Sequence, residues 1–531
     1  MRTETTGGMP ADGILDRLRE LRAADAPTHG GRVLAYVYDP GREELDELAA
    51  AAAREMQPVN GLDPTTFTSV AVLEREVVGF VRTLLGGGGG GGGGDDVVGS
   101  VTSGGTESCL LAVKTARDVW RASADSEAFA RPRVVAPATV HAAFHKAAAL
   151  FGLTLDLVPV DATAGAPTAA AMIERIGPDV ALVVVSAPSY PFATLDPIGE
   201  VAGACAAAEV ACHVDACIGG LILPFWRTPD GAPLPAWDLR VPGVTSISAD
   251  LHKYGYAPKG VSVLLQRGRD RQRAQYFATT SWPGYPVVNP TLLGSKPAGP
   301  LAASWAIIQR LGVDGFAELA ASCLRSTRRI RQTIEQIEGL RVVGDPVGPL
   351  IAVTTDETVP VERRVDAHHW GDQAREHGWI LQLQPPLAQA DGVLLPGTTH
   401  LTITPVTERG LDELCAALVA AADEVRGVPP LAAEDVLAGL PGDVLAALPG
   451  GPGSAASGGT AGVPNAEAAF ALLQALGLVG AAEDGHADAS SGADARLPDR
   501  LAPFMALIGA LPHPLTERLL TELLARVVEP R

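Results

Sequence analysis

Between residues 97 and 265, short valine-rich runs alternate with helix-like stretches, and this alternation limits the possible folds more than any other feature. The runs are VGSV (98–101), RVVAP (133–137), DVALVVVSAP (179–188), VACHVDA (210–216), VTSISAD (244–250) and GVSVLL (260–265). Continuous apolar strands separated by helices are typical of a largely parallel sheet covered on both faces. We therefore expect an α/β fold with a mostly parallel central sheet and helices on both of its faces.

The 531 residues divide into four predicted units. An N-terminal helical segment (1–64) precedes a large domain (65–300) that contains the sheet, and a smaller α+β domain (301–426) follows. Residues 427–531 are rich in Pro, Gly, Ala and Ser between helix-like stretches, which predicts a helical extension with flexible linkers. Nine consecutive glycines at 86–94 cannot hold a helix or a strand, so they predict a surface loop.

Charge and hydropathy exclude several classes of partner. A formal net charge of −20 argues against the clustered basic face of a nucleic-acid-binding protein and against binding to anionic membranes. The N-terminus lacks a basic segment followed by an apolar run, so no secretory leader is expected. No uninterrupted run of about 18 apolar residues is present, so we also expect no membrane anchor.

The six cysteines form neither a CxxC pair nor a Cys/His cluster with zinc spacing. Unpaired cysteines in apolar surroundings are usual in a reducing compartment. We therefore expect reduced structural thiols, no metal site and a cytoplasmic location.

The segment VTSGGTES (101–108) joins a strand-like run to an amphipathic helix. Small residues at a helix start let unpaired backbone N–H groups approach an anion, and Ser103 and Thr106 can add hydroxyl donors. The segment matches neither the GK[ST] ending of a P-loop nor GxGxxG. The alternative to a phosphate site is a tight turn in which Ser or Thr caps the helix.

Two further polar residues follow buried strands. Asp215 in HVDACIGG ends a strand at the position where α/β sheets place ligands. Its carboxylate needs a partner if buried, either a structural arginine or a protonated ring nitrogen. His141 begins a helix after a strand, so it either caps that helix or stacks on an aromatic cofactor.

The stretch SADLHKYGYAPKG (248–260) holds Lys253 with His252 beside it and Lys259 six residues on. A lysine becomes a nucleophile when desolvation or a neighbouring cation lowers its pKa. A solvated basic loop is the alternative. The strand-like runs SIS before the stretch and VSVLL after it argue against this alternative. An anion-binding helix start, a carboxylate, a stacking ring and an amine are together what pyridoxal 5'-phosphate (PLP) requires.

Five motifs closely resemble those of fold-type I PLP enzymes of the group II decarboxylase superfamily, and within it the bacterial, soluble members of the sphingosine-1-phosphate lyase branch. The motifs are TSGGTES, VHAAFHKAAALFG, HVDACIGG, SADLHKYGYAPKG and NPTLLGSKPAGPLAASW. The resemblance extends over roughly residues 60–425. It implies a PLP-binding large domain and a homodimer with shared active sites.

The resemblance also implies roles for residues around the cofactor ring. Lys253 would form the Schiff base with PLP, and Asp215 would pair with the ring nitrogen N1. His141 would stack on the ring, and His252 would contact the cofactor.

Further implied roles concern the cofactor phosphate and the substrate. Gly105 and Thr106 would hold the phosphate, and Ser295 of GSKPAG would reach it from the other subunit. Lys259 would lie near the substrate, and Tyr190 falls in the segment where the lyases carry an active-site tyrosine.

The function implied is carbon–carbon cleavage of a small-molecule amine, a retro-aldol reaction on a (phospho)amino alcohol bound through Lys253. Tyr190 or a cofactor phosphate oxygen would act as the base. Amino-acid decarboxylation is the alternative, and Asp63, which replaces a histidine in NGLDPTTF, fits the amine-bearing substrate of that alternative. A catalytically silent binding protein is disfavoured because Lys253, Asp215 and His141 are all present.

Overall fold

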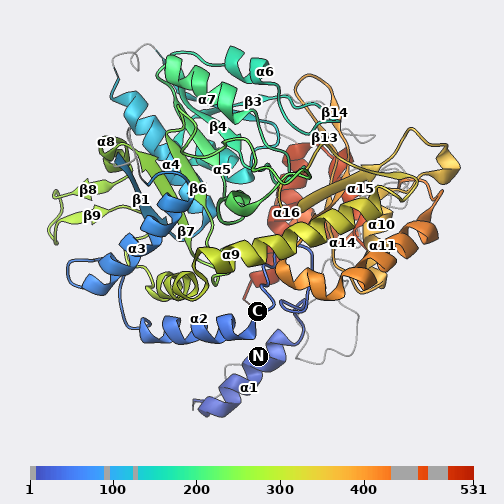
Figure 1. Ribbon diagram of the computed structural model, residues 1–531, viewed down its shortest axis with the longest axis horizontal. Coiled ribbons are helices and arrows are strands. Elements are labelled where there is room, and N and C mark those ends of the chain that lie inside the picture. The colour runs from blue at the N-terminus through green and yellow to red at the C-terminus, as the bar shows by residue number, and fades with distance from the viewer. Residues whose placement is uncertain (1–7, 89–95, 124–128, 432–463, 476–499, 531) are drawn as a thin grey trace.

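The structure is a computed structural model that describes residues 8–88, 96–123, 129–431, 464–475 and 500–530 (Figure 1). Most of the nine-glycine run and most of the linkers predicted beyond residue 427 lie outside these ranges. Among the described residues, no helix has both the length and the apolar content needed to cross a membrane.

A seven-stranded sheet, here the large sheet, forms the centre of the fold, in the order β1-β7-β6-β5-β4-β2-β3. Strand β7 runs antiparallel to both of its neighbours, and the other pairs are parallel. The predicted mostly parallel sheet is therefore confirmed. The strands are β1 (Val97–Thr102), β2 (Arg133–Pro137), β3 (Thr154–Val158), β4 (Val180–Ser186), β5 (Ala211–Asp215), β6 (Ser246–Ala249) and β7 (Ser262–Arg267).

Helices cover both faces of the large sheet because its strands carry apolar residues on both sides. Val134 and Leu182 pack with helices α4 and α5, whereas their neighbours Val135 and Val183 pack with α3, α6, α7 and α9. Alternate residues of a strand point to opposite faces, so continuous valine runs need two layers of helix. The helices are α3 (Thr68–Leu84), α4 (Gly105–Arg121), α5 (Ala142–Phe151), α6 (Ala169–Glu174), α7 (Ile198–Ala207), α8 (Arg269–Ala274) and α9 (Gly299–Ile334).

Helix α9 connects the large sheet to a second, antiparallel sheet, here the small sheet, with the order β10-β11-β15-β12. The sequence predicts one or two helices here, and the single helix is interrupted at Gly312, which adopts a φ of 57°. Trp370 and Trp379 are fully buried in the core between the small sheet and its helices. The elements are β10 (Leu340–Val342), β11 (Leu350–Thr355), α10 (Ala367–Glu376), β12 (Gln382–Gln384), β13 (Leu387–Ala388), β14 (Leu394–Leu395), β15 (Thr398–Thr402) and α11 (Leu411–Val425).

The remaining elements lie at the two ends of the chain and in one exposed hairpin. The C-terminal helices lie beside the small sheet rather than apart from the molecule, as the red ribbon in Figure 1 shows. Helices are predicted from NAEAAFALLQALGLVG (465–480) and APFMALIGALPHPLTERLLTELLARVV (502–528). Helices are present in both stretches, although residues 476–480 of the first lie outside the described residues. The elements are α1 (Ala11–Arg22), α2 (Glu43–Glu55), β8 (Phe277–Thr279), β9 (Val287–Asn289), α14 (Ala466–Ala475), α15 (Ala502–Ala510) and α16 (His513–Val528).

Candidate active site

A cavity of about 1170 Å³ opens where the parallel strands of the large sheet end, facing the small sheet. Its volume exceeds the roughly 300–1,000 Å³ typical of small-molecule sites. It is lined by residues that follow β2, β4, β5 and β6, by the small sheet and by the C-terminal helices. The predicted site residues that line it are Gly105, Thr106, His141, Tyr190, Asp215, His252 and Lys253.

Asp215 is buried at the end of β5, and its surroundings favour the ionised carboxylate. Its Oδ1 accepts hydrogen bonds from Cys217 N at 3.1 Å and from the Ser248 hydroxyl at 3.4 Å. Burial alone would raise the pKa of Asp215, but the charge of His141, a hydrogen bond from the Cys217 side chain and the charge of Lys253 outweigh burial and lower it. No arginine is among these partners of Asp215, so the alternative of a structural arginine does not apply.

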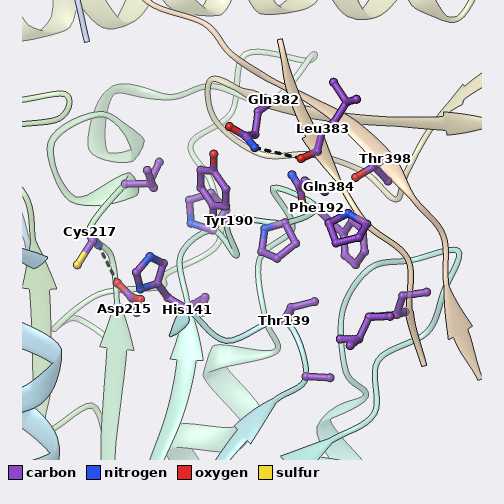
Figure 2. A pocket seen from close by; sticks show the side chains of 18 of the residues that line it. Thr139, His141, Tyr190, Phe192, Asp215, Cys217, Gln382, Leu383, Gln384 and Thr398 are labelled. Atoms are coloured by element: carbon purple, nitrogen blue, oxygen red, sulfur yellow. Dashed lines mark hydrogen bonds between the residues drawn. The ribbon is translucent and has the colours of Figure 1, made fainter. Parts of the chain in front are cut away.

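His141 faces Asp215 across the floor of the cavity, as Figure 2 shows. It is the N-cap residue of α5, and its Nδ1 accepts a hydrogen bond from Ala143 N at 3.2 Å. The capping interpretation is therefore correct. It does not exclude the second interpretation, because the same imidazole is exposed to the cavity, where it can stack on a flat ring.

Lys253 forms an ion pair that the sequence analysis did not anticipate. Its Nζ lies 2.9 Å from Oδ2 of Asp250, a buried carboxylate three residues earlier in the same loop. Burial alone would lower the pKa of Lys253, but Asp250 reverses the sign and raises it well above its ordinary value. The expectation of a lowered pKa is therefore wrong for this state of the lysine. The sequence does carry a signal for this ion pair, because Asp250 stands three residues before Lys253 and one turn of backbone can bring the two side chains together.

Helix α4 begins at the cavity without any side-chain cap, so the capping alternative for SGGTES is wrong. The first-turn N–H groups of a helix have no partner within the helix, and Gly104, Gly105 and Thr106 line the cavity. A Cβ at position 105 would lie 2.6 Å from Asp250 Oδ2, so a larger residue there would displace the carboxylate that pairs with Lys253. Glu107 holds the turn by accepting a hydrogen bond from Ser103 N at 2.6 Å.

These groups fit the predicted cofactor. The uncapped helix start suits a phosphate, the ionised Asp215 suits a protonated pyridine nitrogen, and Lys253 supplies the amine. The buried Oδ1 of Asp250 has no hydrogen-bond partner among the described residues, as expected for a site that receives a further polar group.

Tyr190 lies between the Asp215 side of the cavity and the small sheet (Figure 2). Its ring packs on the buried His400 with a centroid distance of 4.6 Å. Burial, followed by Tyr38 and Tyr36, raises its pKa well above the ordinary value, so the hydroxyl keeps its proton at neutral pH. Tyr36 and Tyr38 also line the cavity, and the sequence analysis missed both because YVYDP carries no recognisable motif.

Lys259 does not line the cavity and lies behind its tyrosine wall. Its Nζ donates to the Tyr36 and His252 carbonyl oxygens at 3.3 Å, and it lies 4.6 Å from the Tyr38 ring centroid. Burial, and then the charge of Lys253, lower its pKa. Its place near the substrate remains a prediction.

Ser295 is exposed and lies away from the cavity of its own chain. Its hydroxyl accepts a hydrogen bond from Asn60 Nδ2 at 3.2 Å, and Asn60 Oδ1 in turn accepts from Lys296 N at 3.3 Å. Asp63 is half-buried in the neighbouring loop, where the hydroxyls of Thr65 and Thr66 hold its pKa at about 2. Contact of Ser295 with a partner's site stays a prediction.

Two thiols lie under Asp215. Ligand atoms of Cys109, Asp215 and Cys217 all lie within 4.8 Å of one another, close enough to share a metal ion. A hydrogen bond with Cys109 and burial raise the pKa of Cys217 well above its ordinary value. All six cysteines are free and buried, which agrees with structural thiols.

Comparison with protein families gives two matches. Residues 48–355 match the model of the pyridoxal-dependent decarboxylase conserved domain. Residues 403–526 match the model of a C-terminal domain of pyridoxal-dependent enzymes.

Similar proteins include the sphingosine-1-phosphate lyase of Dictyostelium discoideum, 37% identical over 68% of this chain and 66% of that protein. The lyase of Oryza sativa subsp. japonica is 34% identical over 76% of this chain and 71% of that protein. The chain thus spans about two thirds of the length of these curated relatives.

Among solved structures, the sphingosine-1-phosphate lyase of Burkholderia pseudomallei superimposes with a TM-score of 0.72 at 31% identity, covering 81% of this chain and 94% of that one. A Lactobacillus brevis glutamate decarboxylase shares the fold at 18% identity, with a TM-score of 0.68, over 81% of this chain and 96% of that one. These likenesses confirm the predicted fold class.

Proposed function

The chain belongs to the pyridoxal-dependent decarboxylase family, and from this membership we propose that it is a PLP-dependent carbon–carbon lyase acting on a (phospho)amino alcohol. One observation carries the proposal: Lys253, Asp215 and Tyr190 face a single cavity in a chain similar to sphingosine-1-phosphate lyases. The bond cleaved would join the carbon that bears the amine to the carbon that bears a hydroxyl, as in a retro-aldol reaction.

The cofactor would be held at the floor of this cavity. Lys253 would bind it covalently, Asp215 would accept a hydrogen bond from its ring nitrogen, and His141 would lie against the ring. The backbone N–H groups at Gly105 and Thr106 would hold its phosphate. When bound, PLP supplies the electron sink that stabilises charge left on carbon after bond cleavage.

Proton transfer would be divided between a tyrosine and a histidine. Because its pKa is raised, Tyr190 suits the donation of a hydrogen bond to the substrate oxygen better than removal of a proton. Burial lowers the pKa of His252, and its Nδ1–H donates to the Val261 carbonyl oxygen at 2.8 Å. In this tautomer Nε2 carries the electron pair and lies 3.5 Å from Asp250 Oδ2, a carboxylate that would stabilise a proton taken up there. His252 is therefore the better candidate for the base.

The proposed assembly is a homodimer. The β8–β9 hairpin and the following segment expose apolar side chains that a second subunit would cover, namely Phe277, Trp282, Tyr285, Val288, Leu292 and Leu293. Ser295 follows this segment directly, so pairing there would carry it toward the partner's cofactor phosphate.

A cytoplasmic location and the division into four units are also proposals. Six free cysteines are suited to a reducing compartment. The proposed boundary at 64/65 precedes α3, the one at 300/301 lies at the start of α9, which leads to the small sheet, and the one at 426/427 follows α11.

Product analysis over a panel of substrates tests the function. The holoenzyme is incubated with long-chain 2-amino-3-hydroxyalkyl phosphates and, separately, with amino acids. The proposal predicts equal amounts of long-chain aldehyde and phosphoethanolamine from the first group and no carbon dioxide from the second. Release of carbon dioxide without aldehyde would instead establish the decarboxylase alternative.

A further inference from the structure

Polar side chains interrupt the apolar interior of the large sheet on two of the strands that lead to the cavity. In β5, which reads ACHVD, His213 and Asp215 lie on either side of a valine. In β6, which reads SISA, Ser246 and Ser248 lie on either side of an isoleucine. Because alternate residues of a strand point to the same face, the polar side chains share one face of the sheet, and the valine and isoleucine belong to the apolar core on the other.

The parallel pairing of β5 and β6 places these polar side chains opposite one another. His213 is in register with Ser246, and Asp215 is in register with Ser248. Each of the four residues is at most 8% exposed, and the ring of Phe144 on α5 packs against His213 with a centroid distance of 5.8 Å. Buried polar groups need hydrogen-bond partners, and here the neighbouring strand supplies them.

Hydrogen bonds join the four side chains into one row that ends at Asp215. Ser246 Oγ lies 2.8 Å from His213 Nδ1, and His213 Nε2 lies 3.2 Å from Ser248 Oγ. Ser248 Oγ then lies 3.4 Å from Asp215 Oδ1. We refer to Ser246, His213, Ser248 and Asp215 as the polar row.

The charge of Asp215 determines the direction of each hydrogen bond in the polar row. An ionised carboxylate can only accept, so the Ser248 hydroxyl donates to it. Because a hydroxyl has one proton, Ser248 must accept from His213, whose proton is therefore on Nε2, and Nδ1 accepts from Ser246. Burial lowers the pKa of His213 to about 4, so at neutral pH the ring is uncharged and holds the single proton that this arrangement requires.

The polar row contacts the cavity only through Asp215. Neither His213 nor Ser248 lines the cavity, so neither can touch a molecule bound there. The donors Ser248 Oγ and Cys217 N both bind Oδ1 of Asp215, at 3.4 and 3.1 Å (Figure 2 shows the second). Donors to a carboxylate favour its charged form, and their placement on Oδ1 leaves Oδ2 as the oxygen for a ring nitrogen.

We propose that His213 and Ser248 are positioning residues, which hold the Asp215 carboxylate ionised and turned toward the ring nitrogen of the cofactor. This inference rests on the part of the proposed function that assigns Asp215 to that nitrogen. An uncharged histidine suits the task, because a cation beside Asp215 would compete with the protonated ring nitrogen for the carboxylate.

Cofactor affinity measured with and without the ring nitrogen tests the proposal. The full-length protein, freed of cofactor by dialysis, is titrated with PLP and with its deaza analogue, in which a C–H group replaces the ring nitrogen. Bound cofactor is followed by absorbance. The ratio of the two dissociation constants, here the nitrogen preference, isolates the contribution of Asp215, because both compounds share the aldehyde, the phosphate and the ring shape. A general disturbance of the fold weakens both compounds and leaves the ratio unchanged.

Three variants and one control are compared with the wild type. Ser248→Ala removes the hydroxyl that donates to Asp215, and His213→Leu removes the ring that orients this hydroxyl. His213→Gln is the conservative variant, because its side-chain N–H lies as many bonds from the backbone as Nε2 does. Ser262→Ala is the matched control, because Ser262 is an equally buried serine on β7 whose hydroxyl donates to the Ala249 carbonyl oxygen at 3.1 Å.

We expect the nitrogen preference to fall about 10-fold in Ser248→Ala, near the lower end for a hydrogen bond to a charged group. It should fall at least about 3-fold in His213→Leu, since the hydroxyl can then turn away, and stay within about 2-fold of wild type in His213→Gln and Ser262→Ala. Binding of the deaza analogue shows that each variant is folded.

An unchanged nitrogen preference in either Ser248→Ala or His213→Leu would overturn the proposal. A wild type without any nitrogen preference would contradict the assignment of Asp215 itself, and the proposal with it. A protein that shows all the expected preferences but releases no aldehyde would contradict the lyase function alone.

Discussion

Replacing Asp250 by asparagine preserves the shape of the side chain and removes the negative charge that pairs with Lys253. The Asp250 side chain is buried, with 1% of it exposed, and 19% of the Lys253 side chain is exposed. At the observed 2.9 Å, two unit charges attract by about 6 kcal/mol at an effective dielectric constant of about 20. Breaking a buried pair by removing one partner typically destabilises a protein by about 3–5 kcal/mol.

The stability of the Asp250→Asn variant should depend on pH because Lys253 can lose its proton when its anionic partner is gone. Without Asp250, burial lowers its pKa below 10.5, and the folded variant releases a proton that the unfolded chain still binds. Neutralising the lysine costs about 1.36 kcal/mol per pH unit below 10.5, hence at most about 4.8 kcal/mol at about pH 7 and about 2 at about pH 9. The stability penalty of the variant relative to the wild type should therefore shrink as the pH rises, because the wild-type lysine is charged in both the folded and the unfolded chain over this range.

Urea unfolding of the cofactor-free protein, followed by circular dichroism at the two pH values, measures this difference. Asp423→Asn is the matched control, because Asp423 also pairs with a cation three residues on, Arg426, but its side chain is 64% exposed. Exposed pairs contribute about 0–1 kcal/mol, so the control should change little at either pH. An Asp250→Asn penalty below about 1 kcal/mol near pH 7, or one that does not shrink toward pH 9, would refute the assigned ion pair.

Three further substitutions test the site. Asp215→Asn should lower turnover by about 100-fold or more while the cofactor stays bound at Lys253, measured by steady-state kinetics and visible absorbance; unchanged turnover would exclude Asp215 as the partner of the ring nitrogen. Tyr190→Phe keeps the ring on His400 and removes the hydroxyl, so kcat should fall about 100-fold with little change in KM, and a purely higher KM would argue for a binding role alone. Ser295→Ala should weaken PLP retention by roughly 10- to 100-fold in equilibrium dialysis, the value of one hydrogen bond to a charged group, and undiminished retention would remove Ser295 from the site.

Much of the fold could be predicted because buried parallel strands are continuous apolar runs. The valine-rich segment 133–137 matches β2 at both ends. The strand at Thr154–Val158 was not predicted, since it lies at the edge of the large sheet, and its partly exposed residues, TLDLV, give a weaker apolar signal. The reversed direction of β7 could not be predicted either, because composition does not encode strand direction.

Part of the candidate site could be predicted, because residues that follow different parallel strands come together at one edge of the sheet. Ligands bind at the carboxyl ends of parallel strands, and this rule brings together His141, Asp215 and Lys253. The tyrosines at 36 and 38 and the wall at 508–513 belong to segments that no strand-end rule connects to the cavity. Their positions depend on how the two sheets and the C-terminal helices pack together.

The predicted direction of the Lys253 pKa shift is wrong for a different reason. The expectation of a lowered pKa rests on the neighbouring cations His252 and Lys259 and leaves out Asp250, which lies in the same loop. One turn of backbone brings the carboxylate to 2.9 Å from the amine, and this close anion, with smaller contributions from Cys217 and Tyr38, outweighs burial.

Identifying the amine that carries the cofactor tests the central claim most directly. Borohydride reduction of the purified holoenzyme fixes PLP to whichever lysine it is bound to, and mass spectrometry of the peptides then locates the label. We expect the label on Lys253, with none on Lys259 six residues away in the same loop. A label on Lys259 or another lysine, or no label at all, would contradict the assignment of this cavity as the catalytic site.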